Sequence, residues 1–380
     1  MITILGGELL CGLGSGETRL HALYEGRPNV GTRDANAGGE TVTFPYYRID
    51  ETPRISDTAI VEGYLDRVVD ALLEKLGTSV SELENIGVFY GSSSIDYSLA
   101  WPIEQDVESG FVHTLGRERV GGGRYVDTLM HRFGFEGPSL TYNTACTSSA
   151  NALMDAASML EGGIIDYALV LGLELYSPTT LEGFMMMQLL SSEAIRPFDQ
   201  NRNGIVLGEA VSAVLLSRDD IAPSSWRYLG GNSNCETHSV TGANPDGSGI
   251  AEVMRHALRD AGTEPEEVTL VKAHGTASDL NDQAEMRGME QVFENLPPYL
   301  SFKPYIGHTL GGCGAAELLL MMESVDAGFV PASANFETLD EDFTQAPIQE
   351  RLTVDSGRFM MNYFGFGGNN TSFIIEKVLP

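Results

Sequence analysis

The sequence has little positive charge, and this limits the partners that it can have. Its 380 residues include 23 lysines and arginines against 53 aspartates and glutamates, which gives a formal net charge of −30. A chain of this kind repels the phosphates of nucleic acids and the headgroups of anionic lipids. We therefore expect neither nucleic acid nor a membrane as a partner.

The sequence also lacks long apolar runs and a recognisable targeting segment. No apolar run approaches the roughly 20 residues that a membrane-spanning helix needs. The first residues have neither the basic start nor the cleavage site of a signal peptide. These features predict a soluble, cytoplasmic protein.

Cysteine is scarce, and the four cysteines are scattered without a CxxC or CxxH pair. Zinc sites and disulfide frameworks use regular short spacings, so neither is expected, and we predict no metal site. Reduced thiols are the default in a cytoplasm. The four residues are Cys11, Cys146, Cys235 and Cys313.

The composition that is present suits a large folded core, with 42% hydrophobic and 20% charged residues. Short β-rich runs alternate with runs of helical period along the chain, which is typical of an α/β fold. Residues 139–144, 150–160 and 167–175 read as a strand, a helix and a buried strand. They form a βαβ unit with Cys146 at its first turn.

The second half of the chain contains similar material. Residues 268–276 read as a strand running into a loop, and residues 281–293 as an amphipathic helix. A glycine-rich turn then leads into a helix at 315–325. Because a strand, a turn and a helix led by small residues occur once in each half, we predict two fused, duplicated halves, 1–220 and 221–380.

Cys146 lies where the first N–H groups of the predicted helix are unpaired and the helix dipole is positive. This setting lowers the pKa of a thiol and suits a nucleophile. Free cysteine is also among the most buried residue types, so this stretch alone leaves catalysis and packing both open. His274 and His308 each lie beside a glycine at a predicted turn, and Lys303 precedes His308 by five residues. A thiol and two imidazoles can generate and stabilise charge around a thioester carbonyl.

Five blocks of the sequence resemble those of the β-ketoacyl-[acyl-carrier-protein] synthases, in that family's order and at about its spacing. They are "TACTSSANAL", "RPFDQNRNGIVLGEA", "KAHGTASDLNDQAE", "KPYIGHTLGGCGAAE" and "NYFGFGGNN". The Cys–His–His set with a lysine matches the elongating branch of the family. The resemblance implies a thiolase-like αβαβα fold of two duplicated halves, usually dimeric, with acyltransferase activity.

The resemblance also implies a mechanism. Cys146 would accept an acyl chain from an acyl carrier protein, and a malonyl-loaded carrier protein would then enter. His274, His308 and Lys303 would complete the catalytic set, with the two histidines assisting decarboxylation. The backbone N–H groups of Cys146 and Phe366 would form the oxyanion hole. No resident cofactor is implied, because the phosphopantetheine arm arrives on the carrier protein.

Four further residues would contact the substrate, by the same resemblance. Thr276 and Ser278 are placed to hydrogen-bond the pantetheine arm, and Ser278 stands where the family commonly has threonine. Met186 and Met187 belong to a flexible, polarizable apolar stretch and are candidates for the acyl pocket. Packing in the core or at a dimer interface is the alternative for the two methionines.

Three acidic residues would support the histidines. Glu285 and Glu317 would form a buried charge network with Lys303, and Asp282 would join that network or help to bind a structural cation. Ordinary helix surface is the alternative for such acids, because carboxylates are seldom buried unless they are paired.

The chain departs from the family in its charge and is shorter than typical members. Acyl carrier proteins are acidic, and the family meets them with a basic patch. Either the arginines of this chain gather at the entrance, or a second subunit supplies the patch. The arginines in question are Arg117, Arg119, Arg124, Arg132, Arg196 and Arg202.

Two assemblies therefore stay open. The chain would form a homodimer, or it would be the catalytic or chain-length-factor subunit of a type II polyketide or aryl-polyene ketosynthase heterodimer. The intact nucleophile and histidines disfavour a purely non-catalytic chain length factor. A degradative thiolase fits less well, because no second catalytic cysteine follows "FGFGG".

Overall fold

The computed structural model describes residues 1–37, 39–49, 58–94 and 121–379, and a ten-stranded sheet lies at its centre. The strand order is β10-β9-β13-β14-β8-β1-β7-β6-β4-β5. From the middle outwards, the first flank consists of β1 (Ile2–Cys11), β7 (Ala210–Arg218), β6 (Tyr167–Glu174), β4 (Ile86–Gly91) and β5 (Ser139–Tyr142). The second flank consists of β8 (Trp226–Cys235), β14 (Asn369–Lys377), β13 (Gly357–Gly365), β9 (Val268–Lys272) and β10 (Tyr299–Leu300).

The two flanks repeat the same pattern of strand directions. β1 and β7 are antiparallel, as are β8 and β14, and the next pairs, β7 with β6 and β14 with β13, are antiparallel too. The outer strands are parallel on both flanks. This correspondence is the one expected of a duplicated unit. The division into two domains at residue 220 stays a prediction, because the ten strands share one sheet.

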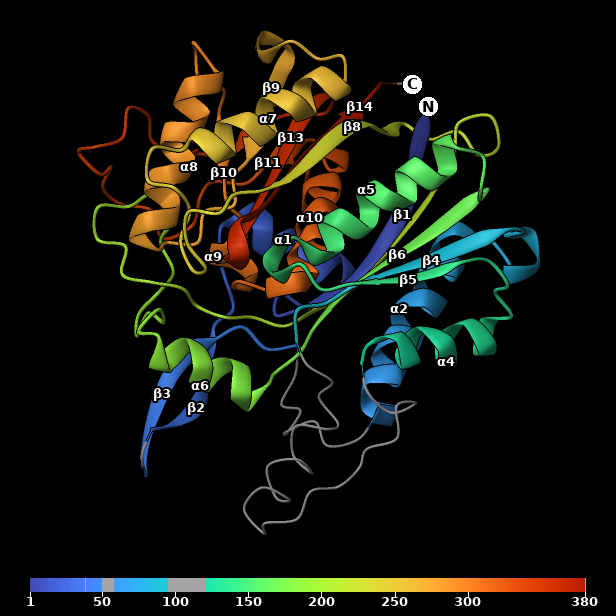
Figure 1. Cartoon of the computed structure of the whole chain (residues 1–380), viewed down its shortest axis with the longest axis horizontal. Coiled ribbons are helices and arrows are strands. Elements are labelled where there is room, and N and C mark those ends of the chain that lie inside the picture. The colour runs from blue at the N-terminus through green and yellow to red at the C-terminus, as the bar shows by residue number, and fades with distance from the viewer. Residues whose placement is uncertain (38, 50–57, 95–120, 380) are drawn as a thin grey trace.

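Helices form three layers around the two flanks, which gives the predicted αβαβα arrangement (Figure 1). The central layer holds α5 and α10, while α2 and α4 cover the first flank and α7 and α8 cover the second. β1 and β8 pair only between residues 2–4 and 226–228, so the sheet can bend there around the central helices. These six helices are α2 (Thr58–Leu76), α4 (Gly123–Phe133), α5 (Ser148–Glu161), α7 (Ser248–Asp260), α8 (Asp279–Val292) and α10 (Cys313–Asp326).

The sequence of the central helices suits a layer that is covered on both sides. Every residue of α10 from Cys313 to Met322 is buried, and all of them except Glu317 are apolar or small, as suits a helix in a protein interior. A Cβ atom at Gly314 would lie 2.3 Å from the backbone nitrogen of Ala150 in α5, so glycine is what lets the two helices touch. β6 and β7 are buried along almost their whole length for the same reason.

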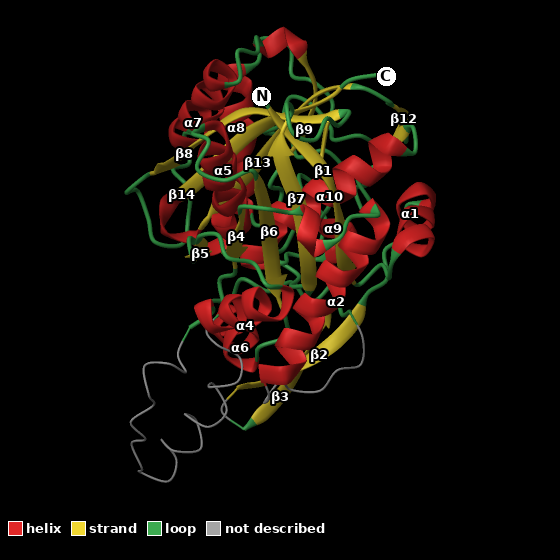
Figure 2. Cartoon of the chain, turned by 90° about the vertical axis from the view of Figure 1, so that its right-hand side faces the viewer, coloured by secondary structure: helices red, strands yellow, loops and turns green. Residues whose placement is uncertain are grey.

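The remaining elements lie around this core. The hairpin of β2 (Gly31–Ala37) and β3 (Glu40–Tyr46) extends away from the sheet with α6 (Pro178–Met186) packed against it (Figure 2). None of the described helices is both long enough and apolar enough to cross a lipid bilayer. The other short elements are α1 (Gly16–Glu25), α9 (Lys303–Ile306), β11 (Phe329–Val330) and β12 (Leu352–Thr353).

Candidate active site

Cys146 lies in a tight turn between β5 and α5. The preceding Ala145 has φ 53°, a left-handed conformation that costs free energy for a residue with a side chain. The hydroxyl of Ser148 holds the turn, because it accepts from the Thr144 N–H at 2.9 Å and donates to the Ala145 carbonyl at 2.6 Å. Strain of this kind is typical of functional sites, where the surroundings impose the conformation. The turn fixes the Cys146 side chain at the start of α5.

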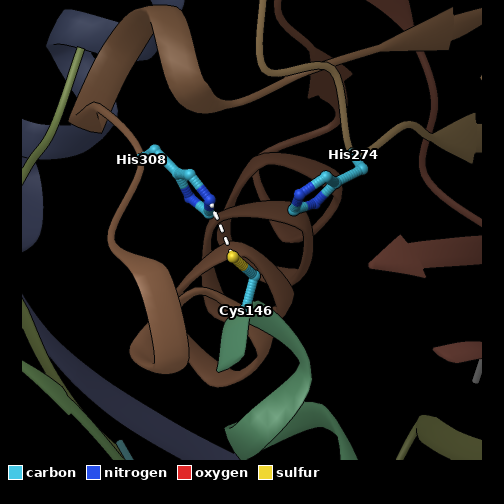
Figure 3. A group of neighbouring side chains, drawn as sticks. All are labelled: Cys146, His274 and His308. Carbon is cyan, nitrogen blue, oxygen red and sulfur yellow. Dashed lines mark hydrogen bonds between the residues drawn. The ribbon is translucent and has the colours of Figure 1, made fainter. Parts of the chain in front are cut away.

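The structure brings Cys146, His274 and His308 together, although 162 residues separate the cysteine from His308 (Figure 3). His308 Nε2 lies 3.1 Å from Cys146 Sγ, and the two imidazole rings lie 5.2 Å apart at 84°. Only 6% of Cys146 and 1% of each histidine is exposed. His274 follows β9 and His308 follows α9, so ends of different elements converge on one sulfur.

Burial controls the protonation of the thiol. It raises the pKa of Cys146 to about 12, against the opposing effects of the Lys303 ammonium and the Phe366 N–H. The backbone N–H at the helix start does act to lower this pKa, as expected, but the loss of water around the sulfur outweighs it and the net shift is upward. Cys146 is a thiol at neutral pH, and it needs a proton acceptor to react. His308 is the acceptor within reach.

Lys303 determines the tautomer of the His274 imidazole. Its ammonium lies 3.3 Å from His274 Nδ1, donates to the His274 carbonyl at 2.6 Å, and pairs with Glu317 Oε1 at 2.9 Å. Burial acts to lower the pKa of Lys303, but Glu317 outweighs it and the pKa is raised, so the ammonium stays charged. An ammonium has no acceptor, hence Nδ1 accepts and the proton of His274 resides on Nε2. His274 thus presents an N–H donor to the cavity.

Glu285 and Asp282 lie one turn apart on α8 and hold the loop that carries His274. Glu285 accepts from the N–H groups of His274 and Gly275 at 2.7 and 2.8 Å. Burial raises the pKa of Glu285 to about 7, against these two donors. Asp282 Oδ1 accepts from the Thr276 N–H at 3.0 Å. Both acids are buried, so the helix-surface alternative does not hold for them.

The predicted charge network therefore divides into two parts. Glu317 pairs with Lys303, whereas the hydrogen bonds found for Glu285 run to backbone N–H groups. The second oxygen of Asp282 accepts from the Phe198 N–H at 2.8 Å. Backbone donors thus occupy both oxygens of Asp282, and this does not support the prediction of a structural cation there.

Lys272 is a buried residue of this site that was not predicted from the sequence. Lys272 ends β9, two residues before His274, and its ammonium lies 2.6 Å from Glu317 Oε2. The sequence does contain a feature that could have indicated Lys272: the chain has only four lysines, and two of them shortly precede the two active-site histidines.

The "GFGG" turn supplies the second backbone donor. The N–H groups of Phe366 and of Cys146 itself both act to stabilise a charged Cys146 sulfur, so both face the reacting centre. Gly367 has φ 78°, which glycine adopts without cost and which reverses the chain just after Phe366. The geometry agrees with the predicted oxyanion hole, whose role stays a prediction.

A cavity of about 260 Å³ leads to the three residues. Thr276 and Ser278 line it, and their hydroxyl groups hydrogen-bond each other at 3.0 Å, while contact with a pantetheine arm stays a prediction. No lysine or arginine is among the described residues that line the cavity. Two acidic residues, Glu236 and Asp279, line it together with apolar and neutral polar side chains, so the charged side chains of the lining are acidic.

Met186 and Met187 do not line this cavity, which corrects their prediction as acyl-pocket residues for the chain on its own. They end α6 with 73% and 44% of their area exposed. Phe184 and Gln188 line the cavity instead, and Phe184 stacks on Phe366 at 5.7 Å. Met185 packs against the core, whereas Met186 and Met187, at the end of α6, face outward.

Of the arginines proposed for carrier-protein docking, those that the structure describes do not form a free basic patch. Arg117 and Arg119 lie outside the described residues. Arg132 pairs with Asp66 and Asp70 at 2.5 and 2.6 Å. The others also have acidic or aromatic neighbours: Arg196 lies near Glu193 and Glu337, Arg202 near Asp279 and Asp340, and Arg124 over the Tyr125 ring.

Cys146, His274 and His308 also offer three ligand atoms within 4.8 Å of one another. In the part of the chain that the structure describes, no other group of three such residues converges in this way. The buried Lys303 and Lys272 ammonium groups disfavour a cation beside them. We therefore interpret the three as a nucleophile with one imidazole that accepts its proton and one that presents an N–H donor.

The buried histidines predict a pH dependence of stability. Burial and the Lys303 charge lower the pKa of both His274 and His308 well below 6.5. Below pH 6.5 each imidazole binds a proton when the protein unfolds. The contribution of each neutral imidazole to the free energy of unfolding is therefore complete above pH 6.5 and is lost as the pH falls. Between pH 6.5 and 5.5 we expect urea unfolding to show a loss of up to about 1.4 kcal/mol per pH unit for each histidine. A His274→Ala/His308→Ala protein should lose less over this interval, and an equal loss would mean that both histidines titrate normally in the fold.

The comparisons with known proteins agree with this geometry. Residues 52–222 match the N-terminal domain of beta-ketoacyl synthase, and residues 227–337 match its C-terminal domain. The chloroplastic 3-oxoacyl-[acyl-carrier-protein] synthase I of Hordeum vulgare is 35% identical over 65% of this chain and 57% of that protein. The 3-oxoacyl-[acyl-carrier-protein] synthase 2 of Synechocystis sp. is 32% identical over 64% of this chain and 62% of that protein. The chain thus spans less than two thirds of the length of these relatives.

A solved structure matches the fold along almost the whole of this chain. A ketosynthase (ApeO) in complex with its chain length factor (ApeC) from Xenorhabdus doucetiae matches with a TM-score of 0.86 and 26% identity. The match extends over 99% of this chain and 98% of that chain. The family domains, the relatives and the fold all lead to one conclusion: this chain belongs to the beta-ketoacyl synthase family.

Proposed function

We propose that the chain is a β-ketoacyl-[acyl-carrier-protein] synthase that condenses malonyl and acyl groups with loss of CO2. One observation carries the proposal: a buried thiol faces two imidazoles at the end of a cavity, with His308 Nε2 3.1 Å from Cys146 Sγ. The names of the related 3-oxoacyl-[acyl-carrier-protein] synthases support this activity.

The first half-reaction transfers the acyl group. The Cys146 sulfur attacks the carbonyl carbon of an acyl thioester on the phosphopantetheine arm, and the thiol proton passes to His308 Nε2. The intermediate collapses with loss of the pantetheine sulfur, which takes up that proton. The N–H groups of Cys146 and Phe366 stabilise the oxyanion. A new thioester at Cys146 and a free carrier-protein thiol result.

The second half-reaction forms the carbon–carbon bond. A malonyl thioester loses CO2, and the Nε2–H of His274, together with His308 in the tautomer that carries its proton on Nε2, stabilises the enolate oxygen. The enolate carbon attacks the Cys146 thioester, and the Cys146 sulfur leaves as a thiolate that recovers a proton from solvent. Thr276 and Ser278 hold the pantetheine arm in both steps. Because the carrier protein brings this arm, the proposed chemistry uses no resident cofactor.

The edge of the sheet beside the nucleophile suits a partner subunit. β5 ends the strand order and leads directly to Cys146, and its residues Ser139, Leu140 and Thr141 are exposed. An exposed strand edge is a template for pairing with another chain. We propose a dimer through β5, which would also cover the exposed Met186 and Met187 if the partner reaches α6.

The heterodimer is the second candidate for the assembly, and two observations favour it. One of the fold matches along the whole chain is to a ketosynthase in complex with its chain length factor. The chain also carries a net charge of −30, and the described candidate arginines lie beside acidic or aromatic side chains. A more basic partner subunit would provide the surface for an acidic carrier protein. A cytoplasmic location stays a prediction.

A condensation assay tests the proposed function. The purified chain is mixed with malonyl-loaded carrier protein and with carrier proteins that bear acetyl to octanoyl groups, and mass spectrometry follows the product. We expect a β-ketoacyl carrier protein together with released CO2. Failure to transfer any acyl group and to release CO2 from malonyl carrier protein would contradict the proposal.

A further inference from the structure

Lys272 is a fully buried lysine in the layer beneath the active site. Its side chain has no exposed area, and it comes from the last residue of β9. Its ammonium donates to Glu317 Oε2 at 2.6 Å and to the Asn362 carbonyl at 2.5 Å, and it lies 3.4 Å from the centre of the Tyr363 ring. A buried ammonium is costly unless it is paired, so this arrangement needs an explanation.

Glu317 serves two ammonium groups at once. Its Oε2 meets Lys272, while its Oε1 meets Lys303 at 2.9 Å, and neither lysine nor the acid has any exposed side-chain area. One carboxylate between two ammonium groups leaves one positive charge in excess. With Lys272 absent, Lys303 and Glu317 would form a neutral pair, and the carboxylate would draw the Lys303 ammonium toward itself.

We propose that Lys272 is a positioning residue of the active site, which shares the Glu317 carboxylate with Lys303 and thereby keeps the Lys303 ammonium on His274 Nδ1. The inference rests on the proposed function of His274 as the N–H donor to the enolate. That role requires the tautomer in which Nδ1 accepts and Nε2 carries the proton. Lys272 therefore acts on the reaction through Glu317 and Lys303 and touches no reacting atom.

The charges that face Lys272 give the direction of its effect. Glu317 on α10 and Lys303 on α9 are its charged neighbours, and Cys313 on α10 is a third titratable group near it. Burial comes first in lowering the pKa of His274, and Lys303, His308 and Lys272 lower it further. Burial lowers the pKa of Lys272 to about 8, against Glu317, so the ammonium is mostly charged at pH 7. Removal of Lys272 should therefore raise the pKa of His274.

Nuclear magnetic resonance of labelled histidine side chains tests the inference without any turnover. The His274 signals are assigned by their loss in His274→Gln, and the tautomer and titration midpoint are compared in wild type and Lys272→Met. We expect the Nε2–H tautomer in wild type and a midpoint higher by about one pH unit in Lys272→Met. The same tautomer and midpoint in both proteins would overturn the inference.

A second variant and a control show whether the charge of Lys272 causes the change at His274. Lys272→Gln removes the charge but keeps a donor for the Asn362 carbonyl, and it should shift His274 in the same direction. Lys377→Met is the control. Lys377 pairs with Asp326 at 2.7 Å and does not belong to the active site, so its removal should leave the His274 titration unchanged. Thermal unfolding verifies that each variant is folded. A shift in Lys377→Met equal to that in Lys272→Met would contradict a specific role for Lys272.

The rate of malonyl decarboxylation then links the position of Lys303 to the reaction. In Lys272→Met we expect the acid limb of the pH–rate profile to move upward by about one pH unit, which is a ten-fold loss of rate on that limb. Acyl transfer to Cys146 should change little. If His274 shifts but this profile does not, Lys272 has no positioning role in the reaction. If wild type itself releases no CO2, the proposed function fails while the His274 titration still tests Lys272.

Discussion

Replacement of His274 by alanine should reduce malonyl decarboxylation by about 10²–10³-fold, the usual cost of a lost oxyanion donor, while acyl transfer to Cys146 continues. His308→Ala should reduce both steps. The difference follows from the geometry, because His308 Nε2 lies 3.1 Å from the Cys146 sulfur, whose pKa of about 12 makes a proton acceptor necessary. His274 instead contacts Lys303 and presents its donor to the cavity.

Two separate assays resolve the histidine variants. Intact-mass analysis measures acyl transfer to the protein, and release of labelled CO2 from malonyl carrier protein measures decarboxylation. His21→Ala is the matched control, since His21 is an exposed histidine on α1, and neither step should change in it. Decarboxylation at the wild-type rate in His274→Ala would assign that histidine a structural role.

Removal of the shared carboxylate should have the largest effect on stability. Glu317→Gln leaves the buried Lys272 and Lys303 ammonium groups without their common anion. Breaking a buried ion pair by removing one partner costs about 3–5 kcal/mol, because the charge that remains is not compensated. We expect a decrease of this size in the free energy of unfolding, measured with urea at pH 7.

Two comparisons show whether the buried charges cause this loss. Asp326→Asn breaks the partly exposed pair with Lys377 and should cost no more than about 1 kcal/mol. Adding Lys272→Met to Glu317→Gln removes one unpaired ammonium, so the double variant should be more stable than Glu317→Gln alone. Equal losses in Glu317→Gln and Asp326→Asn would show that the Glu317 network contributes little to stability.

The resemblance of their blocks to the β-ketoacyl synthase family predicted that Cys146, His274 and His308 form one site, whereas the local pattern around Cys146 alone left packing and catalysis both open. The alternation of strands and helices predicted a layered α/β fold without the resemblance. Such features are local, since a few neighbouring residues determine where a strand ends and which residue begins the next turn.

Features that depend on distant elements could not be read in this way. Lys272 is paired by Glu317 of α10 and the Asn362 carbonyl of β13, and spacing along the chain does not reveal such contacts. The raised pKa of Cys146 reflects burial by the complete fold, which outweighs the helix N-terminus beside it. The exposure of Met186 depends on the phase of a short helix that the apolar composition of the segment concealed.

The nucleophile is the central claim of this account, and the mass of the acylated protein tests it most directly. Wild type and Cys146→Ala are each incubated with an acyl-loaded carrier protein, and the intact mass and the peptide that contains residue 146 are analysed. Cys146→Ala should stay folded, because a methyl group replaces a small buried thiol. We predict one acyl group on Cys146 in wild type and none in Cys146→Ala. Acylation of Cys146→Ala to the wild-type level would contradict the assignment of Cys146 as the nucleophile.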